Sequence, residues 1–132
     1  GQSQLYAQLK QLEESGLVSV RIEEQPNRPA RKVYRLTPEG RAAFEEWVHQ
    51  PTPYLRRIRV EFLARLYFFQ RLSLDGLHEL VAEQKAVCCD QIERFDHLMA
   101  GTEDPFAHLV LEFRRGQLEA VVHWLDRCPE QL

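Results

Sequence analysis

The sequence predicts a mostly α-helical protein that carries one small β-hairpin. Leucines recur at helical spacing within residues 3–15, and two short stretches of alternating apolar and polar residues follow within residues 18–36. Amphipathic segments with helical periodicity then fill the chain from residue 38 onward. This order predicts one small mixed module followed by a helical module.

The first segment is an amphipathic helix over residues 3–15. Leu5, Leu9 and Leu12 follow the spacing of one buried stripe. Ser3 and Lys10 lie opposite that stripe, and the flanks carry Gln4 and Tyr6. Glutamine pairs well with adenine, while tyrosine and lysine suit phosphate oxygens. The alternative is a solvated outer face without a partner.

A β-hairpin with a basic tip follows this helix. Gly16 stands where a left-handed C-cap ends a helix, and strands are predicted at residues 18–24 and 31–37. The intervening QPNRPA contains two prolines and predicts a turn rather than a continuing strand. The basic side chains of the tip are Arg28, Arg31 and Lys32.

A polar helix followed by a basic hairpin is the order found in the second half of a winged helix-turn-helix. That fold places the helix in the major groove, and a slender basic tip reaches the adjacent backbone or minor groove. Double-stranded DNA is therefore the predicted partner. We expect the front helices of the fold to be missing from this chain, so that the 132-residue segment alone binds DNA poorly.

The remaining elements predict a helical dimerisation domain. Thr37 and Pro38 begin a helix that runs to about residue 49, and PTP at 51–53 breaks it. Residues 55–71 form a second helix, with Ile58, Phe62, Leu66 and Phe69 on one face. We assign residues 1–50 to a partial DNA-binding domain, 51–57 to a linker, and 58–132 to the helical domain.

Two long helices make up most of that last domain. One is predicted from Ser73, as N-cap, to about residue 99, and the other starts at Asp104-Pro105 with a stripe ending at Trp124. Joined by a short turn, they form an antiparallel hairpin. Its exposed apolar stripes predict a homodimer, which would hold two recognition helices at the spacing of successive major grooves.

Composition excludes several other classes of protein. Six Lys or Arg face four Asp or Glu within residues 1–36, so the predicted DNA-binding part is basic although the net charge of the chain is −3. We expect a cytoplasmic protein that is not an enzyme, with no cofactor, no metal site and no membrane partner. Cys88 and Cys89 are expected to pack inside the helical domain rather than to act as a redox pair.

LYAQLKQLEESGLV and RPARKVYRLTPEG closely resemble the winged-helix domain of PadR-family transcriptional regulators. IRVEFLARLYFFQRLSLDGLHELVAEQ and FRRGQLEAVVHWLD resemble the opening and the end of the C-terminal domain in that family. The resemblance implies a dimeric repressor that, in many members, senses a small aromatic or hydrophobic molecule. By position it implies DNA contacts from Gln4, Tyr6, Lys10 and the three basic residues of the tip. Because the family usually has a small Ser or Thr at position 4, base preference does not transfer.

An effector pocket is predicted at the centre of the dimer. Aromatic rings stack well on a planar ligand, and four large ones come from the helices that would surround such a cavity. The alternative for each of them is ordinary core packing. The candidate pocket residues are Trp47, Phe95, Phe113 and Trp124.

The sequence thus predicts a homodimeric repressor of a pseudo-palindromic operator, released by a small hydrophobic or aromatic effector. Because a fold does not fix a function, a winged-helix protein–protein adaptor without DNA binding stays open as an alternative. A dimeric carrier of small molecules is the third reading.

Overall fold

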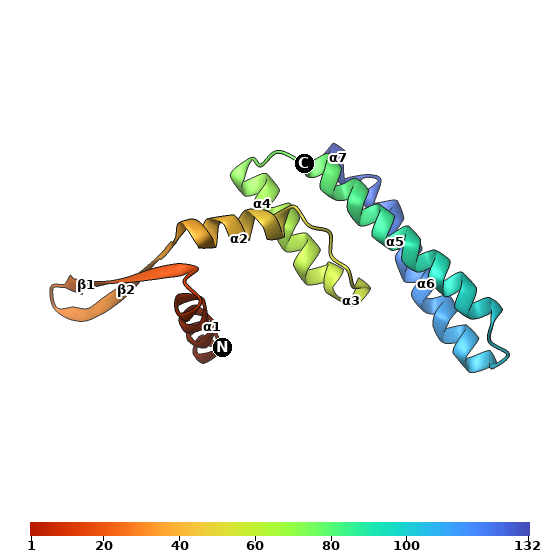
Figure 1. The fold of residues 1–132 in the computed structure, drawn as a ribbon, viewed down its shortest axis with the longest axis horizontal. Coiled ribbons are helices and arrows are strands. Elements are labelled where there is room, and N and C mark those ends of the chain that lie inside the picture. The colour runs from red at the N-terminus through yellow and green to blue at the C-terminus, as the bar shows by residue number, and fades with distance from the viewer. The chain divides into compact units, whose positions relative to one another are not determined.

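The computed structural model describes residues 1–132, apart from the side chain of Gln131. Its elements confirm a mostly helical chain with a two-stranded antiparallel hairpin (Figure 1). The chain divides into two compact units, Gly1–Val48 and His49–Leu132. The elements are α1 (Gln2–Glu14), β1 (Val18–Gln25), β2 (Arg28–Leu36), α2 (Pro38–Val48), α3 (Leu55–Arg57), the π-helical η1 (Ile58–Phe62), α4 (Leu63–Leu72), α5 (Leu77–Ala100), α6 (Pro105–Leu125) and α7 (Cys128–Gln131).

The N-terminal unit is built as predicted in its order of elements. Gly16 follows α1 with a φ of +76°, the left-handed conformation expected after a helix end. Thr37 caps α2, since its Oγ1 accepts a hydrogen bond from the Gly40 amide at 3.0 Å. The helix ends at Val48, one residue before the predicted end.

The hairpin differs from the prediction at its tip. β1 and β2 are longer than expected, and Gln25 pairs with Arg28 across a two-residue turn. Pro29 and Ala30 therefore belong to β2, so the assignment of the whole of QPNRPA to a turn is wrong. Asn27 supplies the positive φ of 61° that the tight turn requires, and the register shift beside it accommodates a proline that cannot donate to the ladder.

The predicted buried stripe of α1 is not buried in this chain. Leu5 is 55% exposed, Leu12 is 39% exposed, and Leu9 is half-buried. The helix packs mainly against β1, which leaves that face exposed. Helical spacing predicts which residues share a face, but it does not supply the element that covers them.

In the C-terminal unit, the helix predicted over residues 55–71 exists as a run of three segments, α3, η1 and α4. The four predicted inward residues Ile58, Phe62, Leu66 and Phe69 are all buried. The π-turn at Ile58–Phe62 widens the helix by one residue per turn. Ser73 closes α4 with a φ of 51°, so its prediction as the N-cap of the next helix is wrong. Gly76 at a φ of +98° starts α5 instead.

The long antiparallel helical hairpin is confirmed, and α5 and α6 lie side by side along their length (Figure 1). Asp104 caps α6 by accepting from the Phe106 amide at 3.1 Å, with Pro105 in the first turn, as predicted. Lys85 and Asp126 join the helices at one end at 2.6 Å, and an ion pair between Arg115 and Asp96 joins them nearer the other.

The apolar stripe predicted for α6 is largely exposed, and the fully buried residues of this helix lie on another side. Leu118 and Leu125 are fully buried, whereas Phe106 is 72% exposed and Phe113 is 67% exposed. Because α6 is apolar on more than one side, its periodicity does not decide which side meets α5. Within the described residues, no helix has the length and apolar character needed to span a membrane.

Candidate nucleic-acid interface and ligand cavity

The outer face of α1 is available to a partner. Ser3, Tyr6 and Lys10 share one stripe because they are three and seven residues apart, and all three are exposed. Gln4, also exposed, lies on the flank of this stripe. The structure therefore brings the predicted reading residues together on a single helix of the N-terminal unit.

The cations of the hairpin are divided between its two faces. Arg28 pairs with Gln25, and Arg31 pairs with Glu23, which are alternate residues of β1 and so share a face. An extra residue in β2 brings these two arginines to the same side although they are three positions apart. Lys32 pairs with Ile22 and points to the opposite face.

Arg31 is engaged within the hairpin. Its Nε and Nη2 donate to one carboxylate oxygen of Glu23, at 3.0 and 2.8 Å, while Arg21 pairs with the other. The hydrogen bond from Arg31 is the largest effect and lowers the pKa of Glu23; burial opposes it, while the charge of Arg31 and the hydrogen bond and charge of Arg21 lower the pKa further. Of the two arginines on this face, Arg28 is therefore more available to a partner than Arg31, which is paired with Glu23.

The base of the hairpin is tied to the end of α1. Thr37 donates through its hydroxyl to the Gly16 carbonyl at 2.7 Å, and its amide donates to the Leu17 carbonyl at 3.1 Å. Gly40 fits closely here, because a Cβ at this position would overlap the Leu17 carbonyl oxygen. These contacts fix the start of α2 to the turn that joins the reading helix to the hairpin.

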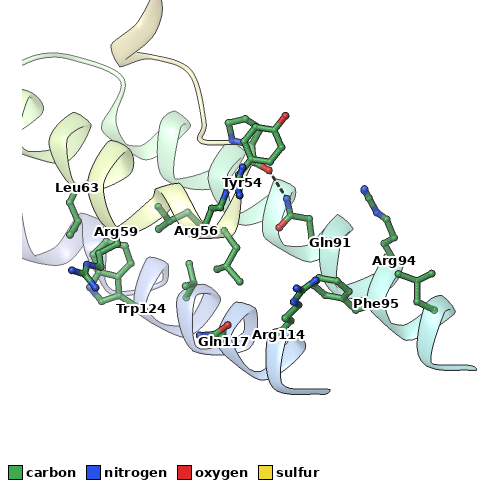
Figure 2. Close-up of a pocket in the computed structure, with 15 residues that line it drawn as sticks. Tyr54, Arg56, Arg59, Leu63, Gln91, Arg94, Phe95, Arg114, Gln117 and Trp124 are labelled. Atoms are coloured by element: carbon green, nitrogen blue, oxygen red, sulfur yellow. Dashed lines mark hydrogen bonds between the residues drawn. The ribbon is translucent and has the colours of Figure 1, made fainter. Parts of the chain in front are cut away.

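The C-terminal unit contains an open cavity of about 1010 Å³ (Figure 2). Its walls come from the segment 53–63 on one side and from α5 and α6 on the other. Phe95 and Trp124, two of the four predicted pocket residues, line it, together with Tyr54. The rings of Phe62 and Trp124 make an edge-to-face contact, with their centroids 6.0 Å apart.

The other two predicted pocket residues are placed elsewhere. Phe113 lies on the exposed side of α6 and is absent from the lining of this cavity. Trp47 belongs to the N-terminal unit, where its ring lies 6.2 Å from that of Phe44. The structure therefore does not gather the four aromatic residues into one site.

Positive charge distinguishes this cavity, and the sequence analysis missed it. No Asp or Glu lines the cavity, and within the described residues its arginines form no ion pair, whereas Arg57 beside them pairs with Glu61 at 3.5 Å. Unpaired guanidinium groups beside aromatic rings favour an anion that carries an apolar ring. The four cavity arginines are Arg56, Arg59, Arg94 and Arg114.

A buried polar network beside the cavity was also missed. Thr52, fully buried, exchanges two hydrogen bonds with the Gln84 side chain, at 2.6 Å from its amide and 2.9 Å to its carbonyl. Arg65 donates to the Thr52 hydroxyl at 2.8 Å, and Gln91 donates to the Pro53 carbonyl at 2.6 Å. In the sequence, the two glutamines only interrupt the apolar repeat of α5.

The cysteine pair does not behave as one unit. Cys88 is buried, as predicted, but Cys89 is exposed because adjacent helical residues project about 100° apart. Burial raises the pKa of the Cys88 thiol, which disfavours the reactive thiolate. Among the described residues, no cluster of three or more His, Cys, Asp or Glu could hold a metal ion.

Two family models match the chain. Residues 1–46 match the one described as the transcriptional regulator PadR-like family, and residues 58–132 match the one described as the virulence activator alpha C-terminal domain. Among curated proteins, the chain is 30% identical over 137 residues to the negative transcriptional regulator PadR of Bacillus subtilis (strain 168). That match covers 94% of this chain and 74% of the relative.

Solved structures of B. subtilis PadR are also similar. The complex with operator DNA has 25% identity and a TM-score of 0.43, covering 100% of this chain and 79% of that one. The complex with p-coumaric acid has 28% identity and a TM-score of 0.39, covering 96% of this chain and 75% of that one. From the family models and the curated relative, this chain belongs to the PadR-like family of transcriptional regulators.

Proposed function

We propose that this protein is a homodimeric repressor that binds a pseudo-palindromic operator and is released by a small aromatic anion. The observation that carries the proposal is the exposed stripe of α1 beside a hairpin that presents Arg28. The B. subtilis relative is described as a negative transcriptional regulator, which favours repression. The proposed DNA contacts are Ser3, Gln4, Tyr6, Lys10, Arg28, Arg31 and Lys32.

Each group of residues has a distinct role in this proposal. Gln4 and Ser3 reach base edges from the N-terminal part of α1, while Tyr6 and Lys10 hold phosphate oxygens. The hairpin adds a charged contact beside the groove, which strengthens binding without reading sequence. One such surface makes few contacts, so a specific site requires two of them.

The exposed apolar side of α6 supports the dimer. Phe106, Leu109 and Phe113 follow one another at helical spacing, and each is more than 60% exposed. A stripe of this kind on a long helix is well suited to a two-fold related copy. Such pairing would fix the distance between two reading helices.

The cavity supports an anionic aromatic effector. Trp124 and Phe95 offer ring faces and edges, and the four cavity arginines offer donors for a carboxylate. A ligand with one ring and one acid group satisfies both parts of the lining. Because the arginines have no acidic partner in this cavity, an uncharged analogue leaves their charge uncompensated.

Binding of the full-length protein to DNA upstream of its own gene tests the DNA function. We expect a specific complex that an unrelated duplex of equal length does not displace. A protein that captures a protein partner but shows no affinity for any duplex would support the adaptor function instead.

The effector site is tested by titrating p-coumaric acid while following tryptophan fluorescence. We expect quenching that is lost in Trp124→Leu, and an affinity about tenfold or more weaker in Arg59→Gln, because a hydrogen bond to a charged group is removed. The matched ligand is 4-hydroxycinnamyl alcohol, which keeps the ring but lacks the charge. Equal affinity of the acid and the alcohol would contradict the anionic class. Quenching without any DNA affinity would favour the carrier function.

A further inference from the structure

Residues 51–53, near the start of the C-terminal unit and called the linker below, are held in place by side chains of α4 and α5. Thr52 is fully buried, and its amide, carbonyl and hydroxyl each have a hydrogen-bond partner. The next carbonyl, of Pro53, accepts from Gln91. A run such as Pro-Thr-Pro is ordinarily read as an extended linker, but here four hydrogen bonds fix it to α4 and α5.

Burial makes this arrangement specific. Gln84 is fully buried within an otherwise apolar face of α5. Burial of a side-chain amide there costs free energy of folding unless its polar atoms form hydrogen bonds. Its side chain accepts a hydrogen bond from the Thr52 amide and donates one to the Thr52 carbonyl. This double pairing favours a single position of the linker. The prolines on either side have fixed φ angles, so a displacement of Thr52 passes along the chain rather than being absorbed locally.

We call the four hydrogen bonds that Thr52 and Pro53 make with Gln84, Arg65 and Gln91 the clamp. Part of the clamp also lines the cavity. Gln91 and Pro53 both line the cavity, and the hydrogen bond between them is drawn in Figure 2. A ligand in the cavity therefore meets the donor and the acceptor of one clamp bond directly. Any ligand group that competes for the Gln91 amide or displaces Pro53 changes the hold on the linker.

A second connection runs through the π-turn. Ile58 and Arg59 of η1 line the cavity, and Glu61 of the same turn lies 3.9 Å from Arg65. Arg65 is the donor to the Thr52 hydroxyl. Because π-turns are irregular segments that often mark functional sites, η1 is well suited to respond to a ligand held against its outer side.

We propose that the hydrogen bonds that Thr52 and Pro53 make with Gln84, Arg65 and Gln91 couple occupancy of the arginine-lined cavity to the DNA-binding unit. This inference rests on the proposed effector function and adds the route by which it acts. The bound ligand shifts the clamp, and the clamp sets the position of the chain that leads into the DNA-binding unit. Gln91 and Gln84 act as positioning residues in this scheme.

The test compares operator affinity of the full-length protein without ligand and with saturating p-coumaric acid. The ratio of the two dissociation constants measures coupling, and saturation prevents a change in ligand affinity from imitating its loss. In the wild type we expect a ratio on the order of 5 to 150. In Gln91→Leu, and in Gln84→Met if that variant folds, we expect the ratio to fall to near one.

The matched control is Gln117→Leu. Gln117 also lines the cavity, but it lies on α6 and forms no hydrogen bond to residues 51–53 among the described contacts. We expect this variant to keep the coupling ratio of the wild type. Hydrogen exchange at the Thr52 amide gives a readout that simple loss of stability does not imitate. Ligand should change this exchange in the wild type and in Gln117→Leu, but not in Gln91→Leu.

Each result separates the clamp from the effector site. If p-coumaric acid quenches Trp124 but Gln91→Leu keeps the ratio of the wild type, the clamp is not the route and this inference is wrong. If the ligand produces no quenching in the wild type, the proposed effector site fails and the inference falls with it. A ratio near one in Gln117→Leu as well would assign the effect to the cavity lining in general and would also overturn the clamp.

Discussion

At the scale of single residues, types and spacing predicted which side chains the N-terminal unit presents. Ser3, Tyr6 and Lys10 are exposed on one side of α1, as helical periodicity requires. The pairing of Arg31 with Glu23 was not predictable, because it depends on a register shift within the hairpin. Two glutamines that only interrupt an apolar repeat in the sequence proved to hold the linker.

Glu23 holds Arg31 within the hairpin, and removal of its charge provides a residue-scale prediction. Glu23→Gln should tighten operator binding several-fold and steepen its salt dependence by about one unit, because Arg31 becomes free to neutralise a phosphate. Salt titrations of a labelled duplex measure both quantities. Glu24→Gln is the control for removing a negative charge near DNA. Equal effects of the two variants would contradict a specific role for the Arg31 pair.

The sign of the pH effect follows from the same pair. Arg31 lowers the pKa of Glu23, so the carboxylate is ionised and paired at neutral pH. Its contribution to hairpin stability is present above the ordinary pKa of 4.5 and is lost as the pH falls through the lowered value.

At the scale of elements, helix signals with a local cause were reliable. Thr37 and Asp104 cap the helices that the sequence assigned to them. Ser73 failed as the N-cap of α5 because it takes the left-handed conformation that ends α4, and Gly76, also left-handed, stands before α5 instead. The side of α6 that meets α5 was also beyond prediction, because that choice depends on which apolar side finds a partner.

Gly40 gives the sharpest element-scale prediction. Gly40→Ala should destabilise the N-terminal unit by about 1–3 kcal/mol or more, because the added methyl group overlaps the Leu17 backbone and cannot be relieved by a rotamer change. Thermal unfolding followed by circular dichroism measures the loss. Arg41→Ala, at the exposed neighbour in the same helix turn, should leave the transition within about 0.5 kcal/mol. A Gly40→Ala protein as stable as Arg41→Ala would contradict the close approach of α2 to the turn.

At the scale of the whole molecule, the chain combines a DNA-binding unit with a helical unit that carries a cavity and an unpartnered apolar stripe. The sequence predicted both units and the helical hairpin because long periodic segments are strong signals. It did not predict the arginine lining, because Arg56 and Arg59, Arg94, and Arg114 come from three separate segments of the chain that line one cavity only after folding. The anionic class of the proposed effector therefore rests on residues that only the folded chain brings to one cavity.

Dimerisation belongs to this scale and is open to a direct test. Phe113→Glu should shift the protein toward monomer in sedimentation equilibrium, because it places a charge within the exposed α6 stripe of Phe106, Leu109 and Phe113. His108→Glu introduces the same side chain at an exposed position outside the stripe and should leave the association unchanged. If both variants associate as the wild type does, the stripe is not the dimer contact.

The central claim is that α1 and the hairpin bind the phosphates of DNA through basic residues such as Lys10 and Arg28. The most direct measurement is the salt dependence of operator binding by the full-length wild type, the double variant Lys10→Ala with Arg28→Ala, and Arg71→Ala as a control in the C-terminal unit. We predict a steep negative slope of log affinity against log salt in the wild type and in Arg71→Ala. In the double variant, binding should weaken and the slope should fall by about one for each lost phosphate contact. Binding that is insensitive to salt, or a double variant that binds as tightly as the wild type, would contradict the claim.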